Sequence, residues 1–335
     1  MPIRLLAIIA ATIASLAPAS AASPSYAVTG SIRGPDGGWD YASVDPATRR
    51  LYVAHGPAVT AVDLNSGKVT PALAPANRPH AVLPIPGSGL LLETDGGSGT
   101  ARVLDASTGA EKARIKVGEN PDAAIWDPRR HSVIVMNAKS GTVMVVDPVG
   151  AKITATVALA AGLEFAALDN AGKLYVNNED RDQIAVVDLD RSSLLGWIDL
   201  KGCKGPTGMA FAPTANRIVS ACGNGVAAVV NPLTRRLVDT IPIGTGADAV
   251  IADPSRKRLF VPSGGSGALT VLAETPGKIA MVETVATEAS ARTGAVDPVD
   301  GKLYLPAARM APPAVPGARC RPAPGSFHLI VVSPQ

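Results

Sequence analysis

The sequence predicts an all-β fold of seven similar four-stranded sheets arranged in a closed ring. One turn position recurs with spacings of 39, 43, 42, 43, 41 and 44 residues, at Asp45, Pro84, Asp127, Asp169, Ala212, Asp253 and Asp297. A second turn position keeps the same period, at Asp63, Asp105, Asp147, Asp188, Asn231, Ala273 and Ser333. Four short β-like runs per 40 to 45 residues match one propeller blade. The predicted fold class is therefore a seven-bladed β-propeller of four-stranded antiparallel blades.

The unit at residues 119–160 shows the repeat most clearly. Its four strands are expected at residues 122–126, 132–136, 142–146 and 152–158. The turns between them contain Asp-Pro, Lys-Ser-Gly and Pro-Val-Gly, in which proline fixes φ and glycine tolerates positive φ. No helical periodicity occurs outside the N-terminus, so crossover helices for a parallel sheet are lacking.

The first 22 residues have the pattern of a secretory signal peptide. Arg4 precedes an apolar run from Leu5 to Leu16, and small residues follow up to Ala21. The run is shorter than the roughly 20 residues of a membrane span, and no later segment qualifies. We expect cleavage after Ala21 or Ala22, a single propeller domain over residues 23–335, and a periplasmic or secreted location. The alternative is an uncleaved anchor.

The two ends of the chain are expected to pair. The seventh unit has strand-like runs at 293–296, 302–305 and 327–332 and then lacks a fourth. The missing strand has a candidate at residues 26–32, which resemble the fourth strand of other units. Pairing these ends would leave no open sheet edge at the seam. Residues 23–33 should then be essential for stability.

Composition excludes some partners. Without Arg4, 30 basic residues face 28 acidic ones, and aromatic residues make up only 4% of the chain. Nucleic-acid binding is therefore not expected, because it needs basic surface and stacking side chains. The three cysteines suit an oxidising compartment.

We expect a disulfide between Cys203 and Cys222. These residues stand before the first strand and at the end of the second strand of the fifth unit, which are neighbours across a hairpin. The third cysteine, Cys320, lies in a proline-rich insertion at residues 306–325. This insertion could form a lid or a partner-docking loop, or simply a mobile loop.

The candidate site lies five residues before each first turn position. Unlike the turn aspartates, which most simply bond nearby backbone N–H groups, these residues differ between units. In a closed ring they gather at one mouth of the central channel, together with adjacent aromatic and histidine residues and two asparagines from later connections. The predicted binding residues are Trp39, Asp40, His80, Asp122, Asn137, Glu164, Phe165, Asn178, Thr207, Asp248 and Arg292. Four carboxylates at one opening favour a polar or cationic ligand. The alternative is that they bond backbone N–H groups and tie neighbouring blades together.

Metal sites have weaker sequence support. Residues 177–182 offer oxygen ligands for calcium but lack EF-hand spacing, so a solvated turn is the simpler interpretation. His55 and His80 have no third histidine or cysteine beside them for zinc or copper. His131 and His328 are expected to be structural. No cofactor is predicted, and a divalent cation at the channel mouth is the open alternative.

Several motifs resemble a known repeat family. LYVAHG (51–56), KLYVNNED (173–180) and RLFVPSG (258–264) are each followed by a VVD-like strand and an SGKV-like turn. They resemble the YVTN-repeat β-propellers, and GGWDYASVDP (37–46), NPDAAIWDP (120–128), GPTGMAFAP (205–213) and PGSF (324–327) look like the exported, YncE-like branch. The resemblance implies the propeller fold and export, and says little of activity. Pro84 and Ala212 depart from the pattern at the turn position.

No enzymatic motif stands out: there is no Gly-x-Ser-x-Gly elbow, HExxH, haem-binding CxxCH or phosphate loop. We therefore expect a monomeric, non-catalytic binding or scaffold propeller, engaging an unknown small ligand or periplasmic protein at the channel mouth. One alternative is a metal-dependent hydrolase or lyase of the propeller-lactonase kind. Another is an accessory subunit of a periplasmic redox system.

Overall fold

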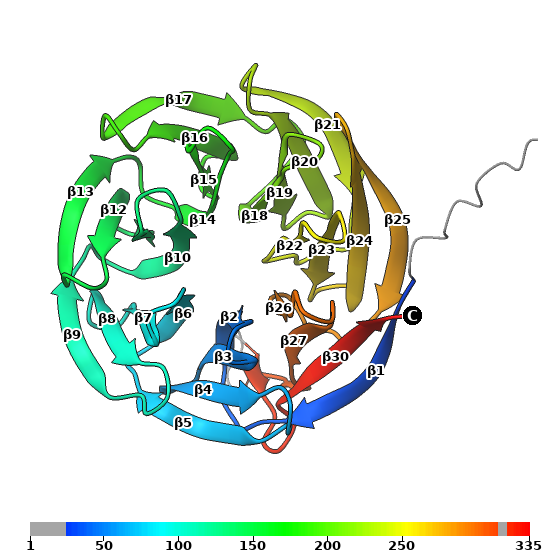
Figure 1. Cartoon of the computed structure of the whole chain (residues 1–335). Coiled ribbons are helices and arrows are strands. Elements are labelled where there is room, and N and C mark those ends of the chain that lie inside the picture. The colour runs from blue at the N-terminus through cyan, green and yellow to red at the C-terminus, as the bar shows by residue number, and fades with distance from the viewer. Residues whose placement is uncertain (1–24, 314–319) are drawn as a thin grey trace, which may run out of the picture.

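The computed structural model describes residues 25–313 and 320–335, so the expected signal peptide lies outside the described residues. Within them the chain forms seven four-stranded antiparallel sheets and one short two-stranded sheet. Figure 1 shows the seven sheets arranged in a ring around a common centre. The predicted seven-bladed propeller is confirmed. No helix among the described residues is long and apolar enough to cross a membrane.

Blades 1 to 6 are each built from four consecutive strands, ordered from the channel outward. The strands of blades 1 to 3 are β2 (Trp39–Asp45), β3 (Arg50–His55), β4 (Ala58–Asp63), β5 (Val69–Pro75), β6 (Pro79–Ile85), β7 (Leu90–Asp95), β8 (Thr100–Asp105), β9 (Glu111–Lys116), β10 (Pro121–Asp127), β11 (Ser132–Asn137), β12 (Thr142–Asp147) and β13 (Lys152–Ala158). Those of blades 4 to 6 are β14 (Leu163–Leu168), β15 (Leu174–Asn178), β16 (Gln183–Asp188), β17 (Ser193–Asp199), β18 (Pro206–Ala212), β19 (Arg217–Cys222), β20 (Val226–Asn231), β21 (Arg236–Pro242), β22 (Ile251–Asp253), β23 (Arg258–Ser263), β24 (Ala268–Thr275) and β25 (Lys278–Ala286).

The two ends of the chain form blade 7 together. Its order is β26 (Ala295–Val296), β27 (Leu303–Ala307), β30 (His328–Pro334) and then β1 (Tyr26–Arg33) at the outer edge. β1 runs antiparallel to β30, from Tyr26 opposite Pro334 to Arg33 opposite His328. The expected closure of the ring by the N-terminal strand is confirmed.

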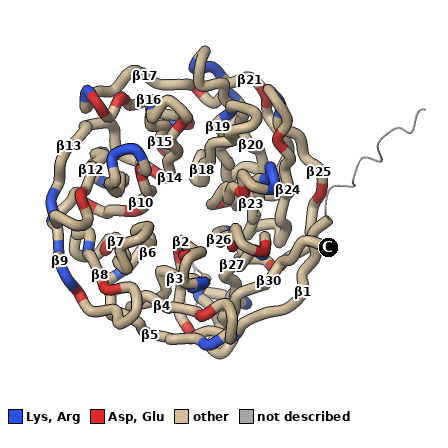
Figure 2. Tube along the Cα trace, in the orientation of Figure 1, with Lys and Arg blue, Asp and Glu red and all other residues tan. Residues whose placement is uncertain are grey.

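Burial explains the strand sequences. In blade 3 all six residues of β11 are buried, because β11 lies between sheets of the neighbouring blades. The outer strand β13 buries only Val157. Alanine recurs on the innermost strands, twice each in β10, β14 and β18, because close-packed sheets leave little space between them. Figure 2 shows charged residues spread around the outer edge, with few on the inner strands.

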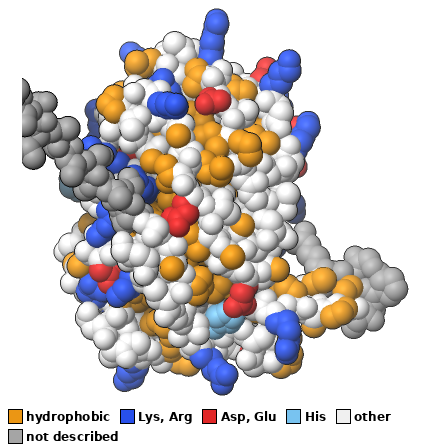
Figure 3. Space-filling model, turned by 90° about the vertical axis from the view of Figure 1, so that its right-hand side faces the viewer, with side chains coloured by type: hydrophobic (Ala, Val, Ile, Leu, Met, Phe, Trp, Pro, Cys, Tyr) orange, Lys and Arg blue, Asp and Glu red, His pale blue; other side chains and the backbone are white. Residues whose placement is uncertain are grey.

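One outer side of the ring carries scattered apolar side chains. Figure 3 shows this side, which includes β25 and β1. Val28, Met281 and Val282 are exposed there by 46, 49 and 52%. A few exposed apolar side chains are normal on a protein surface.

The recurring aspartates are turn residues, as predicted. For example, Asp45, Asp127 and Asp297 each accept a hydrogen bond from the backbone N–H two residues later. Blade 5 has Ala212 at this position, and Glu274 of blade 6 replaces the missing carboxylate by accepting from the N–H groups of Thr214 and Ala215. We call the face that carries these turns the turn face, and the opposite one the mouth face.

The predicted disulfide joins Cys203 and Cys222, whose Cα atoms are 5.4 Å apart. Cys320 is an exposed free cysteine. The proline-rich insertion begins later than residue 306, because Pro306 and Ala307 belong to β27 and pair with β30. Within the insertion, β28 (Met310–Ala311) pairs with β29 (Arg321–Pro322).

Candidate functional site

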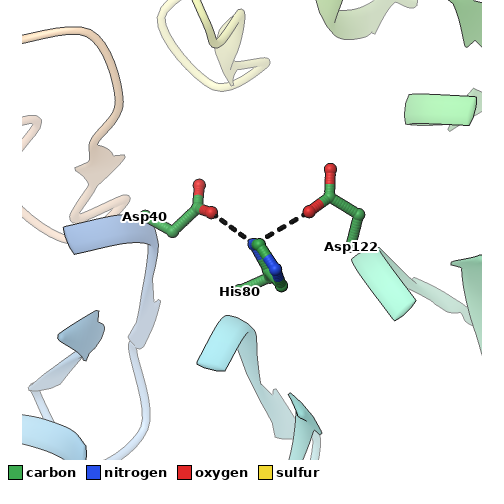
Figure 4. A group of neighbouring side chains, drawn as sticks. All are labelled: Asp40, His80 and Asp122. Atoms are coloured by element: carbon green, nitrogen blue, oxygen red, sulfur yellow. Dashed lines mark hydrogen bonds and ion pairs between the residues drawn. The ribbon is translucent and has the colours of Figure 1, made fainter. Parts of the chain in front are cut away.

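A histidine lies between two carboxylates at the mouth face of the channel. Asp40, His80 and Asp122 stand near the starts of β2, β6 and β10, the inner strands of three successive blades. Nδ1 of His80 lies 2.6 Å from the Asp40 carboxylate and 2.8 Å from that of Asp122. Figure 4 shows both carboxylates pointing at the imidazole. Three blades therefore contribute one side chain each to a single hydrogen-bonded cluster.

The histidine of this cluster carries a positive charge at neutral pH. Burial disfavours the charged imidazole, but hydrogen bonds to Asp122 and Asp40 outweigh it and raise the pKa of His80 to about 10. Burial also raises the pKa of Asp40 to about 6, against the lowering effect of its hydrogen bond to His80. At neutral pH His80 is therefore an imidazolium clamped between its partners.

A second ion pair lies beside the first. Nε of Arg292 donates to the Asp248 carboxylate at 2.9 Å, and its Nη2 donates to the Trp39 carbonyl at 3.0 Å. The guanidinium also lies over the Trp39 ring, 5.5 Å from its centroid. Burial raises the pKa of Asp248, and Arg292 opposes this rise. Arg292 thus joins blades 6, 7 and 1 at the mouth.

Glu164 is the carboxyl of the mouth for which no ion pair forms among residues 25–313 and 320–335. Burial, followed by the repulsion of Asp122, Glu179, Asp248 and Asp40, raises its pKa to about 10. These repulsions mean that the predicted carboxylates do converge from blades 1, 3, 4 and 6. Among the described residues His80 and Arg292 are the cations paired with these carboxylates, and burial with the remaining repulsion keeps a proton on Glu164 at neutral pH.

Replacing Glu164 by glutamine should stabilise the protein at alkaline pH. The folded-state pKa lies above the ordinary value of 4.5, so the neutral group's contribution is full below pH 4.5 and is lost as pH rises towards 10. Glutamine cannot ionise, so we expect E164Q to exceed the wild type by up to about 5 kcal/mol at pH 8 and by little at pH 4.5. Urea denaturation at both pH values checks this. The exposed Glu119→Gln is the control and should change stability at neither.

The side chains of three predicted binding residues form hydrogen bonds within or between blades. Thr207 donates through its hydroxyl to the Ala247 carbonyl at 3.0 Å. The fully buried Asn137 accepts from the Gly118 N–H and donates to Thr142. Asn178 donates to the carbonyls of residues 160 and 161. At these positions the contacts favour the alternative interpretation, in which the residues hold the blades together and do not contact a ligand.

Three further residues that the sequence singled out also contact other parts of the protein. Asn177, the first residue of the candidate calcium segment 177–182, is buried and donates to the carbonyls of residues 207 and 208. His55 does not meet His80, because its ring stacks on Phe327 with centroids 4.0 Å apart. The Trp39 side chain is also buried and packs against Phe327.

Tyr41 belongs to the site although the sequence did not single it out. Its ring lies 5.0 Å from that of Phe165, which comes from blade 4 across the channel. Burial, then the nearby Asp248, Glu164, Asp122 and Asp40 carboxylates, raises the pKa of the Tyr41 hydroxyl well above 10. This aromatic pair therefore underlies the carboxylates. Its only sequence signal is its place next to Asp40 in the same inner strand.

A small hollow opens beside the cluster at the mouth face. It has a volume of about 230 Å³ and is lined by Trp39, Asp40, Arg78, Pro79 and His80, among others. Arg78 is exposed at its rim. The ligand atoms of Asp40, His80 and Asp122 also lie within 4.8 Å of one another, a set that suits a divalent cation. The mouth can thus present carboxylates either to an organic cation or to a metal ion.

Comparisons with known proteins support the fold and nothing beyond it. No family model matches the sequence, and no curated protein does. A chain of a mitotic checkpoint complex is 15% identical with a TM-score of 0.76, over 99% of both chains. A chain of hydrazine synthase from Kuenenia stuttgartiensis is 16% identical with a TM-score of 0.70, over 82% of this chain and 94% of that one. A streptogramin B lyase is 11% identical with a TM-score of 0.70, over 91% of this chain and 97% of that one.

Proposed function

We propose that this protein is an exported, non-catalytic binding propeller whose mouth face takes a small ligand bearing an ammonium or guanidinium group. The observation that carries the proposal is the convergence of Asp40, Asp122, Glu164 and Asp248 from four blades, with two paired cations among them. Burial, together with the repulsion of these carboxylates, keeps Glu164 protonated at neutral pH. A ligand cation would replace that proton and relieve the repulsion.

The family and compartment form part of the same proposal. The three YVTN-like motifs fall on β3, β15 and β23, the second strands of blades 1, 4 and 6, which supports an outlying member of the YVTN-repeat propellers of the YncE-like branch. The Cys203–Cys222 disulfide supports an oxidising compartment such as the periplasm. We propose that the protein is a monomer. The alternative to a small ligand is a protein partner that binds the same mouth face.

Agmatine, which carries both a guanidinium and an ammonium group, is a suitable probe. We expect saturable one-to-one binding by calorimetry, weakened about tenfold in Asp122→Asn through the loss of one carboxylate charge. Asp147→Asn is the matched control, because Asp147 lies in the same blade but caps a turn on the opposite face. Absence of saturable binding, or equal weakening by both variants, would contradict the proposal.

A metal-dependent hydrolase or lyase is the second candidate. It is favoured by the three ligand atoms of Asp40, His80 and Asp122 within 4.8 Å of one another. A metal would have to displace the shared proton on His80, because an imidazole coordinates through a deprotonated nitrogen. Stoichiometric zinc or manganese uptake that His80→Gln abolishes, without agmatine binding, would favour this candidate over the first.

A further inference from the structure

A large hollow lies at the other end of the channel from the carboxylates. It occupies about 560 Å³ and is bounded by β10, β14, β18 and β22 together with the first turns of blades 3 and 4. We call it the turn-face chamber. Its lining includes Trp126, Phe165, Leu168, Phe211 and Val250. A volume of this size and a mainly apolar lining are typical of sites for small organic ligands.

Aromatic side chains are concentrated in this chamber. The whole sequence has only three tryptophans and four phenylalanines, and three of these seven, Trp126, Phe165 and Phe211, line it. All three are partly exposed rather than sealed in the core between blades. Packing of the blades therefore does not account for them fully, and their faces are available for contact with a flat ligand.

On its inner side the chamber adjoins a second, apolar hollow. This second hollow has a volume of about 200 Å³, and Phe165 and Val250 line both. No charged side chain lines this second hollow. The contact between Tyr41 and Phe165 lies between these hollows and the carboxylates. A ligand of the chamber would therefore enter from the turn face.

An arginine with unused donors stands at the rim of the chamber. Arg129 is exposed, and its guanidinium donates to the Ala171 carbonyl. Among the described residues no carboxylate lies within ion-pair distance of it. The nearby Asp127 is paired with Arg130, and Asp169 accepts from two backbone N–H groups. Arg129 can therefore bond an incoming anion without losing a partner.

We propose that the turn-face chamber binds a small organic anion with a flat apolar body. The body would lie among Trp126, Phe165 and Phe211, and the carboxylate or sulfonate would meet Arg129. An apolar body removes the aromatic faces from water, and the anion forms a charge-assisted pair with the guanidinium. This site is separate from the proposed cation site, because the two lie at opposite ends of the channel and attract opposite charges.

The test uses 2-naphthoate as probe and its uncharged amide, 2-naphthamide, as comparison. Titration followed by calorimetry and tryptophan fluorescence should show one-to-one binding of 2-naphthoate about tenfold tighter than of 2-naphthamide. Arg129→Gln should remove this tenfold preference and leave amide binding unchanged. Phe211→Ala should weaken both probes. Arg191→Gln is the matched control, since Arg191 is another exposed turn-face arginine, paired with Asp188 away from the chamber.

Three results would overturn the proposal: no saturable binding of 2-naphthoate, equal affinity for acid and amide, or equal loss in Arg129→Gln and Arg191→Gln. The Arg129→Gln variant should fold like the wild type, because Arg129 is exposed and its replacement removes no core contact. Melting temperatures of all variants are compared with the wild type. Agmatine binding measured in Arg129→Gln reports separately on the mouth face, so failure of one site is distinguishable from failure of the other.

Discussion

Removing Tyr26–Arg33 should lower the melting temperature by on the order of 10 °C, corresponding to a loss of about 5 kcal/mol. The strand supplies one side of the ladder with β30 along its whole length. It also packs Tyr26 against Phe260 of blade 6, with ring centroids 4.9 Å apart, and bonds the Tyr26 N–H to Glu283 at 3.0 Å. Without it, β30 becomes an open sheet edge, which also promotes aggregation.

Differential scanning calorimetry of the truncated chain beside the full mature chain measures this loss. Val28→Ser provides the control, because Val28 is 46% exposed at an irregular point of the β1–β30 ladder and its replacement keeps the strand. The control should melt within a degree or two of the wild type. An unchanged melting temperature on truncation would mean that the N-terminal strand does not hold the ring closed.

Arg102→Met should destabilise the protein by about 3 to 5 kcal/mol, because it leaves a buried carboxylate unpaired. Arg102 and Glu93 are directly opposite each other on β8 and β7, exposed by 5% and 0%. Nε of Arg102 lies 2.6 Å from the Glu93 carboxylate. Burial raises the pKa of Glu93, and Arg102 counteracts this rise. The loss should therefore grow as pH rises above the ordinary range of a glutamate.

Blade 3 provides the design of the rescue. Val135 and Met144 are opposite each other there, at the places that correspond to Glu93 and Arg102 in blade 2. The double variant Glu93→Val/Arg102→Met copies this pair and should recover most of the lost stability, since a well-packed apolar pair replaces a buried ion pair at little cost. Urea denaturation of the single and double variants measures both effects. Equal destabilisation of the two variants would show that packing, rather than the unpaired charge, is responsible.

The architecture was predictable from the sequence because it depends on repeated local rules. A period near 42 residues recurs along the chain, and the turn aspartates at Asp45 and Asp127 follow from a hydrogen bond within three residues. The disulfide between Cys203 and Cys222 followed in the same way, from the position of two residues on one hairpin. Even the closure by residues 26–32 followed from counting strands.

The site was predictable only in part, because its contacts join separate blades. The ring position of Asp40, Asp122 and Glu164 followed from the repeat, but the sequence does not show that His80 reaches two of the carboxylates. Nor does the sequence show that the side chains of Asn137 and Asn178 form hydrogen bonds with backbone groups of the propeller. The contacts of His80, Asn137 and Asn178 depend on the direction in which each side chain points. The turn-face chamber was missed for a related reason, since Trp126 and Phe211 read as ordinary strand residues.

The pairing of the two chain ends has a practical consequence. The N–H of Gln335 donates to the carbonyl of Ser25 at 2.8 Å, so the described chain begins and ends at one spot on the outer rim, as Figure 1 shows for the C-terminus. A short linker can therefore join the ends, and new ones can be opened at a turn between other blades. Circular permutation would move the seam around the ring while leaving both ends of the channel clear for a tether or a label.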